Sequence, residues 1–423
     1  MKYTIKKSVL NGTVKLSGAK NSVLRLLAAS LLSSKNIEIS NYPFGLRDAQ
    51  VHVDMLELLG KKCKKTDNET IIISETENIV TTLNWNDRSI RNTLLILGAL
   101  TSRKGEGAVP LPGGCKLGER KYDLHEMVLR SLGANVWMEN NMLHAKAPKG
   151  GLIGADIYLP IRSTGATENA IICAVLAKGT TKIWNPHIRP EILDLIRFLN
   201  RMGANITVYG QEHIEVNGVE GLDGCNHTVI PDNMEAITWV VGSVITGGDV
   251  EIIGFPFRDL EVALVHLRES GTKFYKGEDR LIVRGGRCYP VEISTGPHPG
   301  INSDVQPILA AYAAQAHGTS RIVDLRFPGR YGYAQEMAKM GLNYKIEENL
   351  LSIHGNGGGL RGADVKALDL RAGAALLLSG LTAEGETNIE DAFQIERGYN
   401  NITDKLKKLG AKIEIVNEEP VAK

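Results

Sequence analysis

The sequence has no long apolar run. Its most apolar early stretch, residues 23–32, is short and is interrupted by Arg25, so it cannot span a bilayer. Lys2, Lys6 and Lys7 stand near the N-terminus, but no apolar stretch follows them directly, as one would in a signal peptide. We therefore expect a cytoplasmic protein that does not associate with membranes.

Cysteines are few, and their spacing indicates neither a metal site nor a disulfide. The five are Cys63, Cys115, Cys173, Cys225 and Cys288. No two of them follow the CxxC spacing of a zinc site, and an odd number argues against a complete set of disulfides. The pattern predicts free thiols in a reducing compartment and no metal centre.

The sequence also lacks an excess of either charge. The 49 lysines and arginines against 48 acidic residues leave a formal net charge of +1, whereas a nucleic-acid-binding domain normally carries a clear basic excess. Any anion site must therefore be a local concentration of arginine and lysine. Because 423 residues exceed the length at which one hydrophobic core usually stops growing, we expect two domains.

What the sequence does contain is an internal repeat. A glycine that follows a short amphipathic helix pattern and precedes an apolar strand recurs at intervals of about 70 residues. These glycines are Gly60, Gly133, Gly203, Gly271, Gly341 and Gly410. Each following strand leads through a polar turn into a second strand, which is typical of a β-hairpin.

A second helix pattern recurs with the same period and is apolar almost all the way round. Its members begin near residues 22, 92, 166, 234, 305 and 372. A helix without a polar face is buried on every side. The sequence therefore predicts an α/β protein of six repeats, each with one buried helix, one amphipathic helix and strands outside. Three repeats packed around their buried helices would form each of two domains.

The buried helices begin with polar or charged residues. These are Lys20-Asn21, Arg91, Ser163-Thr164-Gly165, Asp232-Asn233, Ser303-Asp304 and Asp369-Leu370-Arg371. A helix N-terminus presents unpaired N–H groups and favours an anion. Ser, Asp and Asn are also common N-caps, so a purely structural role remains the alternative for them. Lysine and arginine are poor caps, which favours anion binding at a cleft between the domains.

Residues 111–120 are the segment best suited to chemistry. One proline and three glycines discourage both helix and strand there, which predicts a loop around Cys115. Lys116 and Arg120 flank this cysteine and would favour its thiolate. A lone cysteine is more often a small buried apolar residue, an interpretation that suits Cys173 better.

Several motifs lie far apart in the chain. They are Gly18-Ala19-Lys20-Asn21, the PGGC that ends at Cys115, Arg120 followed by Asp123-Leu124-His125, Asp369-Leu370-Arg371, and Glu396-Arg397-Gly398-Tyr399. In this order and spacing they resemble the UDP-N-acetylglucosamine enolpyruvyl transferases (1-carboxyvinyltransferases) over essentially the whole chain. The resemblance implies an inside-out α/β barrel of two domains, with helices inside and strands outside.

The resemblance also implies a reaction and a set of site residues. Phosphoenolpyruvate would be the donor and a uridine nucleotide sugar the acceptor, with no metal, no organic cofactor and no obligate protein partner. Cys115 matches the family's cysteine, which serves as general acid toward C3 or in product release and which fosfomycin alkylates. Asp304 matches the carboxylate that takes the acceptor's proton. The implied ligands of phosphoenolpyruvate are Lys20, Arg120 and Arg397 for its phosphate, and Arg330 and Arg371 for its carboxylate.

On the acceptor side the resemblance implies a second set. Asn21 would contact the sugar, Arg91 would support the cysteine loop and the nucleotide, and Asp369 would hold Arg371 or the reacting centre. The remaining implied acceptor contacts are Arg120, Asp123, Leu124, Ser163, Thr164, Gly165 and Asp304. We expect one domain over residues 20–231 and the other over 1–19 with 232–423, with closure bringing the two sets together.

The chain departs from the family's usual pattern mainly on the acceptor side. Lys121-Tyr122, residues 186–191, Asn233-Met234 and Arg162 differ from the residues expected there, and Arg330 has unusual neighbours. An enolpyruvyl transferase for another nucleotide, such as uridine monophosphate, is therefore the main alternative. A non-catalytic paralogue that binds a nucleotide sugar, an enolpyruvyl-shikimate-phosphate synthase and an RNA 3′-phosphate cyclase fit the motifs less well.

Overall fold

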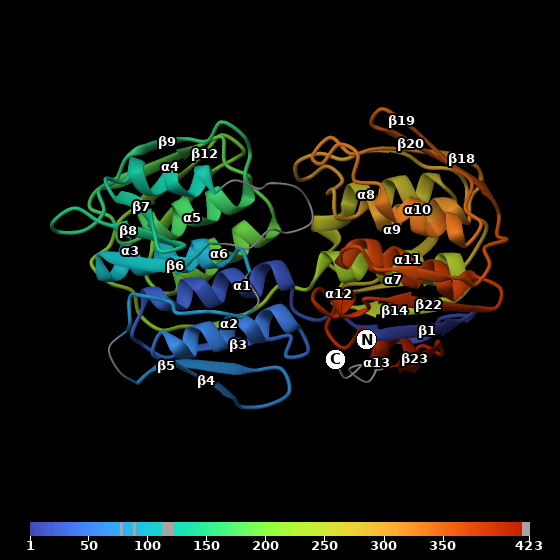
Figure 1. Ribbon diagram of the computed structural model, residues 1–423, viewed down its shortest axis with the longest axis horizontal. Coiled ribbons are helices and arrows are strands. Elements are labelled where there is room, and N and C mark those ends of the chain that lie inside the picture. The colour runs from blue at the N-terminus through green and yellow to red at the C-terminus, as the bar shows by residue number, and fades with distance from the viewer. Residues whose placement is uncertain (77–78, 88–89, 112–121, 417–423) are drawn as a thin grey trace. The chain divides into compact units, whose positions relative to one another are not determined.

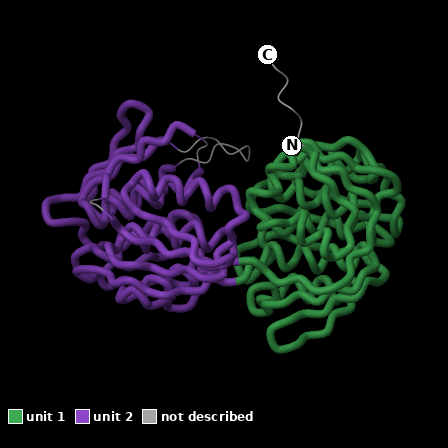
Figure 2. Tube along the Cα trace, turned by 90° about the horizontal axis from the view of Figure 1, so that it is seen from below, with its two compact units in different colours: residues 1–17, 231–423 green, residues 18–230 purple. Residues whose placement is uncertain are grey.

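The computed structural model describes residues 1–76, 79–87, 90–111 and 122–416. The chain divides into two compact units, one of residues 1–17 with 231–423 and one of residues 18–230 (Figure 2). The chain thus crosses from one unit to the other twice, after Ser17 and after Ile230. No helix in the described ranges combines the length and apolarity that a bilayer crossing requires.

The unit of residues 18–230 alternates helices with short strands. Its helices are α1 (Lys20–Ala29), the 3-10 turn η1 (Ser30–Leu32), α2 (Arg47–Leu58), α3 (Thr93–Lys104), α4 (Asp123–Ser131), α5 (Thr164–Ala174) and α6 (Pro190–Arg201). Its strands are β3 (Ile37–Ser40), β4 (Lys61–Lys65), β5 (Ile71–Glu75), β6 (Glu106–Pro110), β7 (Asn135–Glu139), β8 (Met142–Lys146), β9 (Asp156–Tyr158), β10 (Thr180–Trp184), β11 (Asn205–Tyr209), β12 (His213–Asn217) and β13 (Asn226–Thr228).

The other unit is built in the same way. Its helices are α7 (Asn233–Thr246), α8 (Phe257–Glu269), α9 (Gln306–Ala314), α10 (Gly332–Lys339), α11 (Leu370–Thr382), α12 (Phe393–Glu396) and α13 (Ile402–Lys408). Its strands are β1 (Lys2–Lys6), β2 (Asn11–Lys15), β14 (Asp249–Ile253), β15 (Lys273–Lys276), β16 (Arg280–Arg284), β17 (Glu292–Ser294), β18 (His317–Val323), β19 (Tyr344–Glu347), β20 (Leu350–Asn356), β21 (Asp364–Lys366), β22 (Glu386–Glu390) and β23 (Lys412–Val416).

One strand order recurs among the sheets. In β9-β10-β12-β11 the first pair is parallel and the next two pairs are antiparallel. The same arrangement occurs in β13-β3-β5-β4, β2-β14-β16-β15, β17-β18-β20-β19 and β21-β22-β1-β23. The remaining described sheet has the order β6-β8-β7, and a single parallel bridge from Thr82 to Ala108 takes the place of its fourth strand.

The repeat glycines end helices, as the sequence predicts. All six have a positive φ, between 89° and 100°, which only glycine adopts at low cost. After α6, Gly203 N donates to Asn200 O at 3.1 Å and Ala204 N donates to Leu199 O at 3.0 Å. This pair of bonds closes the helix and turns the chain toward β11.

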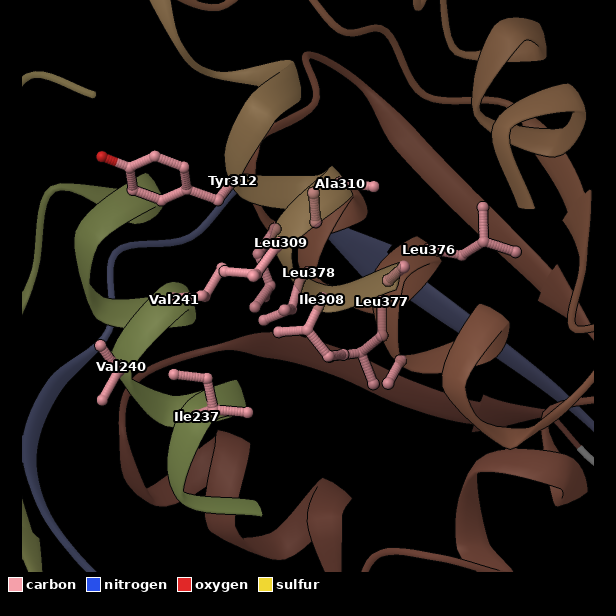
Figure 3. Packing of buried hydrophobic residues seen from close by; sticks show 14 of the residues in the cluster. Ile237, Val240, Val241, Ile308, Leu309, Ala310, Tyr312, Leu376, Leu377 and Leu378 are labelled. Carbon is pink, nitrogen blue, oxygen red and sulfur yellow. The ribbon is translucent and has the colours of Figure 1, made fainter. Parts of the chain in front are cut away.

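The helices expected to be buried are buried. In α7, α9 and α11 almost every side chain is inaccessible to solvent, and the three helices pack against one another (Figure 1). The residues that meet there include Ile237, Val241, Ile308, Leu309, Leu377 and Leu378 (Figure 3). Helices α1, α3 and α5 occupy the core of the other unit in the same way. Their N-termini therefore start from rigid, close-packed supports.

An ion pair joins two of these buried helices. Arg25 Nε of α1 lies 2.8 Å from Glu168 Oε1 of α5, and the two side chains are 16% and 1% exposed. Burial raises the pKa of Glu168, and Arg25 opposes that shift. The ionised form of Glu168 therefore depends on Arg25.

Replacing Arg25 with methionine should destabilise the protein by about 3–5 kcal/mol, because it leaves a buried carboxylate without its partner. Lys146→Met is the matched control in the same unit, because the Lys146–Glu106 pair is exposed and should contribute less than about 1 kcal/mol. Urea unfolding followed by circular dichroism measures both. Equal losses in the two variants would contradict the assigned role of burial.

Candidate active site

Three charged side chains of the unit of residues 1–17 and 231–423 meet at one point. Asp304 lies in the turn that leads into α9, Arg330 lies between β18 and α10, and Arg371 lies in the first turn of α11. Arg330 Nη1 is 2.9 Å from Asp304 Oδ1, and Arg371 Nε is 3.6 Å from Asp304 Oδ2. The structure thus brings together three residues that the sequence places 26 and 41 positions apart.

Asp369 completes this cluster. Its Oδ1 accepts hydrogen bonds from Arg371 N at 2.7 Å and Ala372 N at 3.0 Å, so it is the N-cap of α11. The same carboxylate lies 3.5 Å from Arg330 Nη2. Asp369 therefore fixes the start of α11 and helps to orient Arg330, whereas its direct ion pair is with Arg330 and not with Arg371.

Arg371 is buried, with 1% of the residue exposed. Its guanidinium lies over the ring of Tyr399, 5.3 Å from the ring centre. Burial alone would lower the pKa of Arg371, but Tyr399 and Asp304 raise it above its usual range, so the side chain stays charged. Such a cation in a low-dielectric setting binds an anion strongly.

Both arginines keep unused donors. Within the described residues, Arg371 Nε and Nη1 and Arg330 Nε have no hydrogen-bond acceptor. A buried donor without an acceptor costs free energy, and a ligand that supplies the acceptor recovers it. Asp304 is 30% exposed at its side chain, so the cluster has an accessible side. The arrangement suits a carboxylate or phosphate.

Arg397 lies close by in the chain, directly after α12. Its Nη1 donates to Gln394 Oε1 at 2.9 Å. The same segment carries Tyr399, whose hydroxyl is 2.9 Å from Thr238 Oγ1 of α7. Tyr399 thus ties the Arg397 segment both to α7 and to the Arg371 guanidinium.

In the unit of residues 18–230, Lys20 and Asn21 begin α1. Lys20 Nζ lies 2.8 Å from Asp48 Oδ2 of α2, and both side chains are less than a tenth exposed. Sequence patterns did not indicate this partner. A lysine carries its charge on a long, flexible side chain. The ion pair with Asp48 therefore restricts the Lys20 ammonium to the start of α1. Asn21 beside it is half-buried.

A buried histidine lies among several of the predicted acceptor residues. His125 of α4 follows Asp123 and Leu124, and burial, aided by the nearby charge of Arg91, lowers its pKa to about 3. A Cβ placed on Gly165 would lie 3.0 Å from His125 Nε2, so α4 and α5 approach closely there. The neutral His125 therefore packs against Gly165 where the starts of α4 and α5 meet. Sequence reasoning assigned it no role.

Ser163 and Thr164 lie at the N-terminus of α5. Ser163 is the N-cap, accepting from Ala166 N at 3.4 Å, and Asp232 caps α7 in the same way with bonds of 2.8 and 2.9 Å. The structural alternative considered for these caps is thus confirmed, and a role for Ser163 in binding stays a prediction. Thr164 Oγ1 lies 2.8 Å from His187 Nδ1, a contact that the sequence did not reveal.

Cys115 and Arg120 lie outside the described residues. Burial raises the pKa of the thiols that the structure does describe, to about 12 for Cys63, to about 11 for Cys225 and Cys288, and well above the usual range for Cys173. These four are protonated and weakly nucleophilic near neutral pH. Among the described residues, no group of three or more histidine, cysteine and acidic side chains could hold a metal ion.

The sequence matches the family model of EPSP synthase (3-phosphoshikimate 1-carboxyvinyltransferase) over residues 5–418. Two bacterial relatives named UDP-N-acetylglucosamine 1-carboxyvinyltransferase are similar over almost their whole length. The protein of Caldanaerobacter subterraneus subsp. tengcongensis is 41% identical, covering 97% of this chain and 99% of the relative. That of Finegoldia magna is 40% identical, covering 98% and 99%.

The chain is also similar to solved structures of enolpyruvyl transferases. The enolpyruvyl transferase NikO from Streptomyces tendae superposes with a TM-score of 0.88 at 25% identity and 98% coverage of both chains. EPSP synthase from Acinetobacter baumannii has a TM-score of 0.78 at 18% identity, covering 98% of this chain and 100% of its own, which shows a shared fold. The chain belongs to the EPSP synthase family of enolpyruvyl transferases, among its UDP-N-acetylglucosamine 1-carboxyvinyltransferase members.

Proposed function

We propose that this protein transfers the enolpyruvyl group of phosphoenolpyruvate to the 3-hydroxyl of UDP-N-acetylglucosamine and releases phosphate. This reaction is the first committed step of peptidoglycan synthesis. The arrangement of Asp304 between the buried cations Arg330 and Arg371 carries the proposal. Asp304 can accept a proton, and the two guanidinium groups can donate hydrogen bonds to the carboxylate of phosphoenolpyruvate. The reaction needs both functions.

The reaction proceeds by addition and elimination. The acceptor hydroxyl attacks C2 of phosphoenolpyruvate, Asp304 takes the hydroxyl proton, and Cys115 delivers a proton to C3. The resulting tetrahedral ketal loses phosphate from C2 and a proton from C3, which restores the double bond in the product. Proton transfer by a positioned group of this kind contributes about 10²–10⁴ to a rate.

Arg330 and Arg371 hold the donor's carboxylate in this proposal. Asp304 pairs with both of them, at 2.9 Å from Arg330 and 3.6 Å from Arg371. An incoming carboxylate would compete with Asp304 for these guanidinium groups, because the unused N–H donors already favour an anion. Binding of the donor would thus leave Asp304 freer to accept a proton. Lys20, Arg120 and Arg397 take the phosphate, and Asp369 supports Arg330.

Apart from Asp304, the acceptor contacts are assigned to the other unit. Asn21 binds the sugar, and Arg91 supports the nucleotide side. Arg120 binds the nucleotide together with the starts of α4 and α5, which contribute Asp123, Leu124, Ser163, Thr164 and Gly165. Helix N-termini suit a diphosphate because their N–H groups point at it. The proposed overall architecture is the inside-out barrel of six repeats, which the recurring sheet order and the buried helices support.

A second acceptor is a specific alternative. The contact between Thr164 and His187 lies where the sequence departs from the family's usual pattern, so a different nucleotide, such as uridine monophosphate, remains a candidate. Initial rates of phosphate release from phosphoenolpyruvate, with each nucleotide supplied separately, test the two. Release only with uridine monophosphate would keep the chemistry and reject UDP-N-acetylglucosamine. Release with neither would favour a paralogue that binds nucleotide sugar without turnover.

Replacing Cys115 with aspartate should leave part of the activity and abolish alkylation by fosfomycin. A carboxylic acid can still deliver a proton, whereas only a thiolate opens the epoxide readily. In the unaltered protein, peptide mass spectrometry should find the adduct on Cys115 alone, because the other four thiols have raised pKa values. An adduct on the aspartate variant would show that a different thiol reacts.

A further inference from the structure

A fully buried carboxylate, that of Asp324, is hydrogen-bonded to the residue next to Asp304. Asp324 directly follows β18 and is fully buried. Its Oδ1 accepts hydrogen bonds from Thr295 Oγ1 at 2.8 Å, Arg326 N at 2.9 Å and Phe327 N at 3.0 Å. A buried carboxylate is tolerated only when donors satisfy its oxygens, and these three satisfy one of them.

The other oxygen of Asp324 faces the proposed active site. Oδ2 accepts from Ser303 Oγ at 2.5 Å and lies 3.5 Å from Gln306 Nε2. Ser303 is the residue immediately before Asp304. Gln306 Nε2 also donates to the backbone oxygen of Arg330 at 3.0 Å. The Asp324 carboxylate is therefore linked to the Asp304 turn by one hydrogen bond, through Ser303. It is linked to the backbone of Arg330 by two successive hydrogen bonds, through Gln306.

The segment that carries Arg330 is also tied back to Asp324. Asp324 N donates to Tyr331 Oη at 2.8 Å, and this hydroxyl donates to Asn349 O at 2.8 Å. Asn349 Nδ2 donates to Asp324 O at 2.9 Å, and Gly329 N donates to Asn349 Oδ1 at 2.9 Å. Arg330 is thus held between two anchored neighbours, with little freedom to move relative to Asp324.

We infer that Asp324 is a positioning residue that sets the Asp304 carboxylate against the Arg330 guanidinium. The inference rests on the proposed function, in which both groups act on the substrates. Its physical basis is preorganisation, since a misplacement of about 1 Å can cost about a hundredfold in rate. Asp324 acts through Ser303 on one side and through Gln306 on the other.

Two substitutions separate positioning from mere stabilisation. Ser303→Ala and Thr295→Val each remove one buried hydroxyl donor from the same carboxylate, at Oδ2 and Oδ1 respectively. Only Ser303 adjoins Asp304. Each variant should lose a similar, modest amount of stability, measured as a small fall in the urea midpoint of unfolding. They spare Asp324 itself, whose removal would leave several buried donors without an acceptor.

Steady-state kinetics and urea unfolding of the full chain provide the test. We expect Ser303→Ala to lower kcat about tenfold or more with KM values changed less than about threefold, and Thr295→Val to keep kcat within about twofold. Ser303→Thr, which retains the hydroxyl, should restore most of kcat. An equal fall of kcat in the alanine and valine variants, or an unchanged kcat in Ser303→Ala, would overturn the inference. Absence of turnover in the unaltered protein would instead overturn the proposed function itself.

Discussion

Replacing Asp304 with asparagine should lower kcat by about 10²–10⁴ and leave nucleotide binding nearly unchanged. The amide keeps the shape of the side chain and an oxygen for Arg330 Nη1, which lies 2.9 Å away in the unaltered protein. It cannot accept the proton of the acceptor hydroxyl, so the rate loss reflects removal of the general base. Phosphate release measures kcat, and titration calorimetry measures nucleotide affinity.

A matched control separates this effect from a general loss of charge. Asp249 pairs with Arg284 at 3.1 Å on the exposed surface of the same unit. Asp249→Asn should leave kcat and affinity unchanged, because exposed pairs contribute little. If Asp304→Asn turned over as fast as the unaltered protein, Asp304 could not be the base.

Replacing Arg371 with methionine should raise the KM for phosphoenolpyruvate at least about thirtyfold, because loss of a charge-assisted bond in a desolvated site costs about 2–5 kcal/mol. The same change should lower the free energy of unfolding by less than about 1 kcal/mol, because Arg330 keeps Asp304 paired and the unsatisfied buried donors of Arg371 are removed. Steady-state kinetics and urea unfolding measure the two quantities.

Arg268→Met is the control for this prediction. Arg268 is exposed and also lies over an aromatic ring, 5.0 Å from the centre of Phe274 in the same unit. Its replacement should not alter the KM for phosphoenolpyruvate. A large stability loss in Arg371→Met with an unchanged KM would mean that Arg371 supports the fold and does not bind the donor.

The elements of this fold could be predicted from the sequence because their causes are local. Each repeat glycine takes a positive φ at a helix end. Because glycine is favoured in that conformation, the helix end can be recognised from one residue of the sequence. The helices around Ile237, Leu309 and Leu377 are apolar on all sides because they lie in the core. Both signals are contained within a few neighbouring residues.

The partners of the site residues could not be predicted, because they come from distant parts of the chain. Nothing in the sequence around Lys20 indicates that Asp48 accepts its charge. Asp324 follows an ordinary strand pattern, yet it receives donors from residues 295, 303 and 306. Periodicity shows which face a residue occupies but not which side chain it meets there. Such contacts arise from the tertiary fold and leave no pattern in the neighbouring sequence.

The most direct test of the central claim is the mass of the nucleotide sugar after purified protein has been incubated with phosphoenolpyruvate and UDP-N-acetylglucosamine. The proposed reaction predicts that each phosphate released corresponds to one nucleotide sugar made heavier by one enolpyruvyl group. Phosphate release with no change in the mass of the nucleotide sugar would contradict it, and so would the absence of both.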